Sequence, residues 1–267
     1  MAPDISICIV LYEPDRDILM KTLDTLATAV RIFSGEKRFK LYIVDNSPTP
    51  AISVSNHIAF QAIPTEIIYG QGNIGFGRAN NLALDRGIGR YHLVLNPDVE
   101  LSASTLWECF AFMEQHVDCI LLTPAATYPD GSTQFLCKQY PNLFDLLIRG
   151  FAPRPIQEIF RGRLEQYEMR RQIKQIVFWD PPIVSGCFMF FRGDIFCRLK
   201  GFDQRYMLYF EDFDISLRAA CLGRIAYVPS VKIIHRGGNA AKKGLWHIHQ
   251  FLRSAIIFFT SHKIKLF

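Results

Sequence analysis

The sequence contains no Asp or Glu from Ile215 to Phe267, although nine Lys and Arg residues fall within that stretch. All 25 acidic residues therefore lie in residues 1–214, and the net charge of +5 arises wholly in the C-terminal fifth of the chain. Nucleic-acid binding domains place basic residues on a groove-fitting element or an aromatic sheet surface. Here they accompany an apolar C-terminal segment, so we expect no nucleic-acid partner.

Paired cysteine motifs are also missing. The seven Cys residues are odd in number and show no CxxC spacing, which excludes a disulfide framework and indicates free thiols in a reducing compartment. The N-terminal stretch MAPDISICIVLYEP lacks a basic region before its apolar run. We therefore expect a first strand there rather than a signal peptide, and a cytoplasmic protein.

No apolar run approaches the ~20 residues that a membrane-spanning helix needs. In the C-terminal segment, apolar residues recur at helical spacing: Leu245, Ile248, Leu252, Ile256 and Phe259. Polar residues lie between them: His249, Gln250 and Arg253. The pattern predicts a basic amphipathic helical tail over residues 241–267. That helix either packs on the domain or lies on an anionic membrane surface, and both interpretations stay open.

The chain does contain a regular alternation of strands and helices. Strands are expected at residues 5–12, 41–47, 65–70, 91–99, 119–127 and 184–192, with two further short strands after a helix that ends near Cys221. Helices are expected at residues 15–29, 79–87 and 102–117. This alternation predicts an α/β fold with a mostly parallel sheet flanked by helices. Residues 138–178 mix helical pieces with prolines and are expected to form an insertion or lid.

Two of the expected strands end on polar residues. The second ends on Asp45, and the fourth runs into Asn96-Pro97-Asp98, where Pro97 cannot donate to a sheet ladder. Ligands of open α/β sheets bind outside the carboxyl ends of strands. Each carboxylate is therefore either a turn residue or a ligand group, and its place alone does not decide between them.

A glycine-rich turn, GNIGFGRANN, precedes one helix. Gly75 and Gly77 permit close backbone approach to a diphosphate at a helix N-terminus, and Arg78 adds a cation. The dinucleotide fingerprint is only partly met, because Asn80 replaces its third glycine. A nicotinamide-type Rossmann site and a simple N-cap turn therefore both remain alternatives.

Two further motifs offer reactive groups. In YFEDFDISLRAA, three acids lie among aromatic residues at a helix start: Glu211, Asp212 and Asp214. A helix N-terminus accounts for one or two of them, and a carboxylate flanked by aromatics gains basicity that suits a general base. In IIHRGG, His235 ends an apolar run, and its ring paired with Asp98 would form a mixed N/O site for Mn²⁺ or Mg²⁺.

Together these features fit a nucleotide-sugar transferase. Departure of a nucleoside diphosphate needs a divalent cation and oriented donors, and a single displacement needs one base. A glycoside hydrolase would need two carboxylates flanking the bond, and no second partner is evident.

The order of seven motifs resembles glycosyltransferase family 2, and more narrowly the bacterial rhamnosyltransferases and their galactofuranosyltransferase relatives. The motifs are IVLYEP, VDNS, NIGFGRANN, LNPDV, VSGCFMFFR, GFDQRYMLYFEDFDISLRA and HRGG, and they cover about residues 5–240. The resemblance implies a GT-A fold over residues 1–240, an inverting mechanism and a divalent metal.

The resemblance also implies roles for individual residues. Asp45 would hold the nucleobase, and three residues would line the rest of the nucleotide: Asn73, Gly75 and Arg78. Asn96 and Asp98 occupy the place of the family's Asp-x-Asp metal motif, with His235 as an additional metal ligand. Asp212 would be the base, with Glu211 beside it. Asn96 departs from the family pattern, which has Asp at this position. A neutral amide is a weaker metal ligand than a carboxylate.

The expected function is transfer of L-rhamnose from dTDP-rhamnose to a lipid-linked saccharide in cell-surface polysaccharide (O-antigen type) biosynthesis. The expected location is the cytoplasmic membrane face, where the basic tail would meet anionic lipid; a homo-oligomer is left open. The alternatives are a galactofuranosyl or other hexosyl transferase using a UDP-sugar, a non-catalytic sugar-nucleotide or membrane-binding module, and an NAD-type oxidoreductase.

Overall fold

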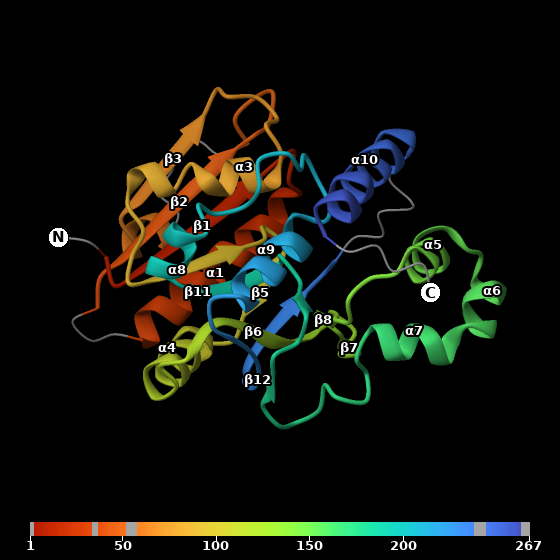
Figure 1. Cartoon of the computed structure of the whole chain (residues 1–267). Coiled ribbons are helices and arrows are strands. Elements are labelled where there is room, and N and C mark those ends of the chain that lie inside the picture. The colour runs from red at the N-terminus through yellow and green to blue at the C-terminus, as the bar shows by residue number, and fades with distance from the viewer. Residues whose placement is uncertain (1–2, 34–36, 52–57, 238–243, 263–267) are drawn as a thin grey trace.

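The structure is a computed structural model that describes residues 3–33, 37–51, 58–237 and 244–262 (Figure 1). The strands of the main sheet are β1 (Ile5–Leu11), β2 (Phe39–Asp45), β3 (Thr65–Tyr69), β4 (Tyr91–Leu95), β5 (Val99–Leu101), β6 (Cys119–Thr127), β7 (Thr133–Gln134), β9 (Phe178–Trp179), β11 (Phe188–Arg192) and β12 (Arg224–His235). A two-stranded sheet holds β8 (Cys137–Lys138) and β10 (Ile183–Val184). The helices are α1 (Arg16–Ile32), α2 (Ile58–Ala62), α3 (Phe76–Asn81), the short 3₁₀ helix η1 (Leu84–Arg86), α4 (Thr105–Gln115), α5 (Leu143–Phe151), α6 (Arg154–Ile159), α7 (Arg161–Tyr167), α8 (Gly193–Arg198), α9 (Glu211–Ala220) and α10 (Leu245–Ser261).

The main sheet has the order β3-β2-β1-β4-β11-β6-β12-β5. The first four strands are parallel, β11 runs antiparallel to both of its neighbours, and β12 is parallel to β6. The predicted α/β class is confirmed. The carboxyl ends of β2, β4 and β12 consequently lie along one edge of the sheet, together with the start of β11.

The prediction of two short strands after α9 is wrong. A single strand, β12, spans both of them and pairs with β6 over most of its length. Its register shifts between Val228 and Lys232, around Pro229, which lacks the N–H that a continuous ladder needs.

Alternating residues of each strand face two helical layers, as the pleat requires. In β1, Ile7 and Ile9 join the apolar core beneath α1, α2 and α4, while Cys8 and Val10 face α3. The helices α8 and α9 cover the same face as α3 further along the sheet. The helix α1 begins where Asp15 accepts the backbone N–H groups of Asp17 and Ile18, close to the predicted start.

The insertion and the C-terminal helix lie on one side of the sheet. Figure 1 shows α5, α6 and α7 as a lobe beyond β8, with α10 above it. Leu146 of α5 and Tyr167 of α7 share an apolar cluster with Phe258 of α10. The same cluster contains Tyr206 and Phe210, in the loop that leads into α9. The insertion and α10 therefore both pack against the loop that precedes α9.

The helix α10 packs through a face that its apolar spacing did not indicate. Its buried residues are Gln250, Ser254, Ala255 and Phe258. Leu252 and Ile256, which belong to the predicted apolar stripe, are 48% and 66% exposed. Ser254 can face the domain because it finds a partner there: its Oγ donates to the carbonyl of Leu208 at 2.8 Å. The helix thus packs on the domain and still presents apolar residues outward. Among the described residues, no helix combines the length and hydropathy of a membrane span.

Candidate active site at the carboxyl edge of the sheet

The predicted site residues follow strands that meet at one edge of the sheet. Asp45 ends β2, where it is in register with Leu11 of β1 and Tyr69 of β3. Asn96 and Asp98 come directly after β4, which pairs with the other side of β1. Parallel pairing alone thus brings these polar groups to a common edge.

Asp45 is almost fully buried, and its carboxylate already caps a turn. It accepts the backbone N–H of Ser47 at 2.9 Å and that of Ala51 at 2.6 Å. Tyr12 follows β1 and Tyr69 ends β3, and these side chains are 50% and 65% exposed on either side of Asp45. Such exposed aromatics at strand ends are candidates to stack on a planar ring, a signal that our sequence analysis did not use.

The glycine turn is shaped by a neighbouring loop. Gly75 has a φ of 91°, and a Cβ at this position would lie 2.3 Å from the carbonyl oxygen of Met207. Asn73 accepts the backbone N–H of Gly75 at 3.1 Å, and the Nε of Arg78 donates to the carbonyl of Gln204. Asn73 and Arg78 are exposed. The loop before α9 therefore lies directly against the turn predicted to line the nucleotide.

Asp98 and His235 are neighbours, with 3.4 Å between Oδ1 and Nε2. They meet because β5 pairs with β12 and places His235 opposite Val99, the residue after Asp98. The other ring nitrogen, Nδ1, lies 2.9 Å from Oε1 of Gln134, which can only accept, so Nδ1 carries a proton and Nε2 is the nitrogen that faces Asp98. Gln134 comes from the β6–β7 hairpin and was missed by sequence analysis.

The environment of this pair favours positive charge. Burial by itself raises the pKa of Asp98, but the hydrogen bond and charge of His235 outweigh burial and hold that pKa below its ordinary value. Burial likewise lowers the pKa of His235, while Cys187 and Asp98 outweigh it and raise that pKa. An N/O pair in an environment that stabilises positive charge suits a divalent cation. Within the described ranges, no group of three or more His, Cys, Asp and Glu side chains is arranged to hold a metal ion.

A two-residue segment before β11 connects this pair to the acidic helix. The backbone N–H of Gly186 donates to Oδ2 of Asp212 at 3.0 Å. The next residue, Cys187, accepts the backbone N–H of Asn96 at 2.9 Å, and its thiol contacts the ring of His235. The structure thus gathers Asn96, Asp98, His235 and Asp212 around Gly186-Cys187. We call these four residues with Asp45 the carboxyl-edge site.

The three acids of α9 have different surroundings. Asp214 is buried and paired with Arg218 at 2.7 Å and with His262, just beyond α10, at 2.9 Å. It therefore ties α10 to α9, which explains the third acid structurally. Asp212 accepts two backbone N–H groups, from Gly186 and Phe213. Burial raises the pKa of Asp212 in spite of these bonds, and a carboxylate of raised basicity suits proton abstraction.

Glu211 is buried, and no described residue pairs with its Oε2 atom. Burial and the adjacent charge of Asp212 raise its pKa from 4.5 to about 8. The residues before it, Tyr209 and Phe210, have φ values of 70° and 65°, a left-handed conformation that costs about 1 kcal/mol or more for non-glycine residues. Contacts with α10 hold this bend: Tyr209 Oη lies 2.8 Å from Nδ1 of His247, and Phe210 packs on Phe258.

The raised pKa of Glu211 predicts a pH-dependent stability. The unfolded chain ionises Glu211 near pH 4.5, whereas the folded protein keeps the proton until about pH 8, so stability is lost as the pH rises through that window. Glu211→Gln removes this loss. We expect thermal unfolding to show a Tm advantage of the variant over wild type that is absent at pH 4.5 and grows towards pH 8. An equal Tm difference at every pH would contradict the assignment.

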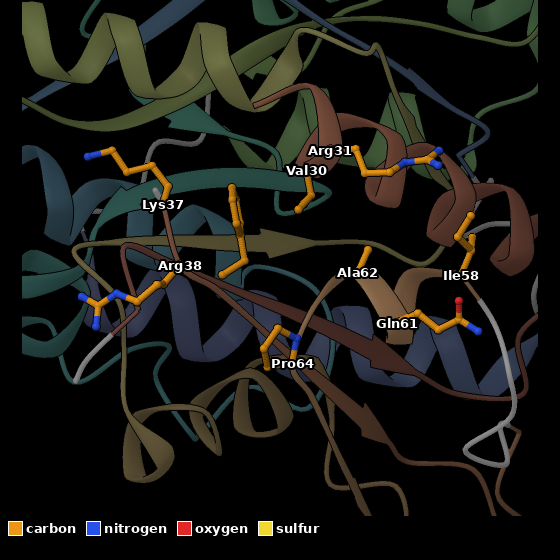
Figure 2. A pocket seen from close by; sticks show the side chains of 9 residues that line it. Val30, Arg31, Lys37, Arg38, Ile58, Gln61, Ala62 and Pro64 are labelled. Atoms are coloured by element: carbon orange, nitrogen blue, oxygen red, sulfur yellow. The ribbon is translucent and has the colours of Figure 1, made fainter. Parts of the chain in front are cut away.

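A surface pocket lies elsewhere among the described residues. It has a volume of about 540 Å³ and is lined by Arg31, Lys37 and Arg38 among others. Figure 2 shows these three cationic side chains spread apart rather than converging. The pocket adjoins Phe39, the first residue of β2, whereas the carboxyl-edge site adjoins Asp45, the last. It contains none of the predicted site residues.

Comparison with known proteins agrees with this fold. The family model described as glycosyl transferase family 2 matches residues 6–199. The chain is 26% identical over 245 residues to the N-acetylglucosaminyl-diphospho-decaprenol L-rhamnosyltransferase of Mycobacterium tuberculosis, covering 84% of this chain and 75% of that protein. It is 24% identical over 266 residues to rhamnosyltransferase WbbL of Escherichia coli K12, covering 92% of this chain and 90% of that protein.

A crystal structure of GalNAc-T7 with UDP, GalNAc and Mn²⁺ superposes with a TM-score of 0.62 at 16% identity, over 88% of this chain and 43% of that one. The chain thus spans less than half of that structure, and the likeness concerns the fold. Fold and family match define the class of protein, a glycosyltransferase with a GT-A-like fold. The chain belongs to glycosyl transferase family 2.

Proposed function

We propose that this enzyme is an inverting rhamnosyltransferase that moves L-rhamnose from dTDP-rhamnose onto a polyprenyl-diphosphate-linked saccharide in cell-surface polysaccharide synthesis. The observation that carries the mechanism is the carboxyl-edge site, where Asp98 and His235 lie on one side of Gly186-Cys187 and Asp212 on the other. The names of both relatives support the choice of rhamnose. The name of the M. tuberculosis relative supports the choice of a polyprenyl-diphosphate-linked acceptor.

In this proposal the donor lies along the carboxyl edge. Asp45 accepts from the nucleobase, while Asn73, Gly75, Arg78 and Asn96 line the nucleotide. Asp98 and His235 fit Mn²⁺ or Mg²⁺, because the Nδ1–H of His235 is bound to Gln134 and its Nε2 faces Asp98, where loss of the Nε2 proton would free a lone pair for the cation. Held by these two residues, a divalent cation would supply charge neutralisation to the leaving diphosphate. Asn96 contributes at most a neutral oxygen, so Asp98 is the only carboxylate of this motif.

Asp212 acts as the general base. Its carboxylate, held by the backbone N–H groups of Gly186 and Phe213, takes the proton from an acceptor hydroxyl. The hydroxyl oxygen bonds to the anomeric carbon as the bond to the diphosphate oxygen breaks on the opposite face. One displacement of this kind inverts the anomeric configuration. Glu211 is protonated at neutral pH and therefore adds no second negative charge next to the base.

The test is a donor panel followed by a transfer assay. Thermal shifts with Mn²⁺ should rank dTDP-rhamnose above UDP-galactofuranose and UDP-N-acetylglucosamine, and mass spectrometry should find one deoxyhexose added to a prenyl-diphosphate saccharide. A larger shift and transfer with UDP-galactofuranose would favour the galactofuranosyl alternative. Donor binding without transfer to any acceptor would indicate a non-catalytic module, and a shift with NADH alone would indicate an oxidoreductase.

We further propose that α10 holds the enzyme on the cytoplasmic face of an anionic membrane. Four of its exposed residues are apolar: Leu245, Trp246, Leu252 and Ile256 are between 47% and 84% exposed. Arg253 lies between them, and residues 215–267 carry nine basic residues and no acid. An apolar face with basic neighbours favours adsorption to anionic lipid.

Leu252→Glu with Ile256→Glu is expected to abolish cosedimentation with phosphatidylglycerol-containing vesicles, because two charges replace inserted apolar groups. Wild-type binding should fall with added salt and be weaker on pure phosphatidylcholine. Val117→Glu is the matched control and should bind as wild type. Val117 is an apolar residue that follows α4 and is 80% exposed. Unchanged binding by the double variant would remove the membrane assignment.

A further inference from the structure

The insertion carries an unbalanced group of cations. Glu168, directly after α7, is shared by three positive side chains: Lys138 at 3.5 Å, Arg149 at 3.3 Å and Arg170 at 2.8 Å. We call these four residues the Glu168 cluster. Lys138 is buried, and burial together with the charge of Arg149 lowers its pKa to about 8, even though Glu168 opposes this. Arg170 also lies 3.8 Å from Glu165, a carboxylate that is shared with Arg161. The three cations of the cluster still outnumber its one carboxylate, and an anion would compensate this excess of positive charge.

The Glu168 cluster adjoins the apolar cluster that leads into α9, the helix that carries the proposed base. Leu146, one helical turn before Arg149, and Tyr167, next to Glu168, pack in the same apolar cluster as Phe210, which directly precedes Glu211. Arg149 is close enough to Asp212 that its charge lowers the pKa of that carboxyl against the effect of burial. Its side chain is 47% exposed, so the guanidinium remains open to a ligand.

A buried hydroxyl group without a hydrogen-bond acceptor lies at the end of α7, in the insertion. The hydroxyl of Tyr167 is buried and has no hydrogen-bond partner among the described residues. The charges of Arg149, Asp212 and Glu168 all affect the pKa of this hydroxyl. A buried polar group without a partner is costly, so this part of the site is incomplete as it stands. The exposed guanidinium beside it has the planar, two-pronged donor geometry that matches phosphate oxygens.

We propose that Arg149, supported by Lys138 and Arg170, binds the diphosphate of the lipid-linked acceptor. The inference rests on the proposed function and adds an acceptor subsite to it. In an acceptor with a single sugar, such as the one in the name of the M. tuberculosis relative, the diphosphate is attached to the same sugar that carries the attacking hydroxyl. A cation beside Asp212 therefore holds the diphosphate where that hydroxyl meets the base. The donor diphosphate, by contrast, belongs at Asp98 and His235.

The test measures acceptor binding without donor or metal. Isothermal titration in EDTA compares a short-chain prenyl-diphosphate saccharide with the same saccharide on a phosphate-free alkyl chain. Wild type should bind the diphosphate compound more tightly. Arg149→Ala should weaken that binding about tenfold or more and leave binding of the alkyl glycoside unchanged, because only a charge-assisted pair is lost. Arg149→Lys should retain part of the affinity.

Arg161→Ala is the matched control, since Arg161 is an exposed insertion residue paired with Glu165 on α7. It should bind both compounds as wild type. If Arg149→Ala binds the diphosphate compound as wild type does, or loses both compounds equally, the subsite is wrong. Tight, Arg149-dependent binding by a protein that transfers no sugar would support the subsite and reject the proposed function.

Discussion

Asp212→Asn is expected to lower kcat by about a thousandfold while the Kd for the nucleotide sugar stays at the wild-type value. The amide cannot take a proton from the acceptor hydroxyl, but its oxygen can still accept the N–H of Gly186, so the loop before β11 keeps its place. The donor does not depend on this carboxylate in the proposed mechanism. Single-turnover transfer and donor titration measure the two quantities separately.

Asp214→Asn is the matched control on the same helix. Asp214 pairs with Arg218 and His262, so its loss should reduce the free energy of unfolding by about 2 kcal/mol, measured with denaturant. The kcat of the folded variant should be unaffected. If Asp212→Asn turns over like wild type, or if the Asp214 variant shows the thousandfold loss instead, the base is misassigned.

Asp98→Ala is expected to lower kcat/KM by at least about a hundredfold, because the cation that neutralises the leaving diphosphate loses its carboxylate ligand. Donor binding should weaken in the presence of Mn²⁺ and should no longer respond to EDTA. Titration of dTDP into the variant with and without Mn²⁺ measures this directly. Asp98→Ala thus impairs donor binding, which Asp212→Asn leaves intact.

Glu100→Gln controls for the loss of charge in this region. Glu100 lies two residues further along, in β5, and pairs with Arg236 at 3.4 Å. Its variant should keep the Mn²⁺ response and the wild-type kcat/KM. Metal-independent donor binding by wild type, unchanged in Asp98→Ala, would contradict the metal assignment.

The parts of the site that depend on strand ends were predictable. Asp45 and Asp98 follow apolar runs that end in turn-forming residues, and parallel pairing then places them at one edge without further information. The α/β class follows from the same alternation. Local patterns could not show that β11 would run antiparallel between β4 and β6, because that depends on the path of the insertion.

Three residues whose partners are distant in sequence were missed by sequence analysis. Gln134 orients His235 across 101 positions, and His262 pairs with Asp214 across 48. The packing face of α10 was missed for the same reason, because buried Ser254 donates a hydrogen bond to the carbonyl of Leu208, in a loop 46 residues away. In each case a polar side chain gains its role only from a contact that the fold creates.

The most direct test of the central claim is an anomalous diffraction map of crystals grown with Mn²⁺ and dTDP. The account predicts an Mn²⁺ peak between Asp98 and His235, bridged to the diphosphate, with the thymine ring near Asp45 and the sugar side facing Asp212. Nucleotide bound instead in the pocket of Arg31, Lys37 and Arg38, or Mn²⁺ away from Asp98 and His235, would contradict it.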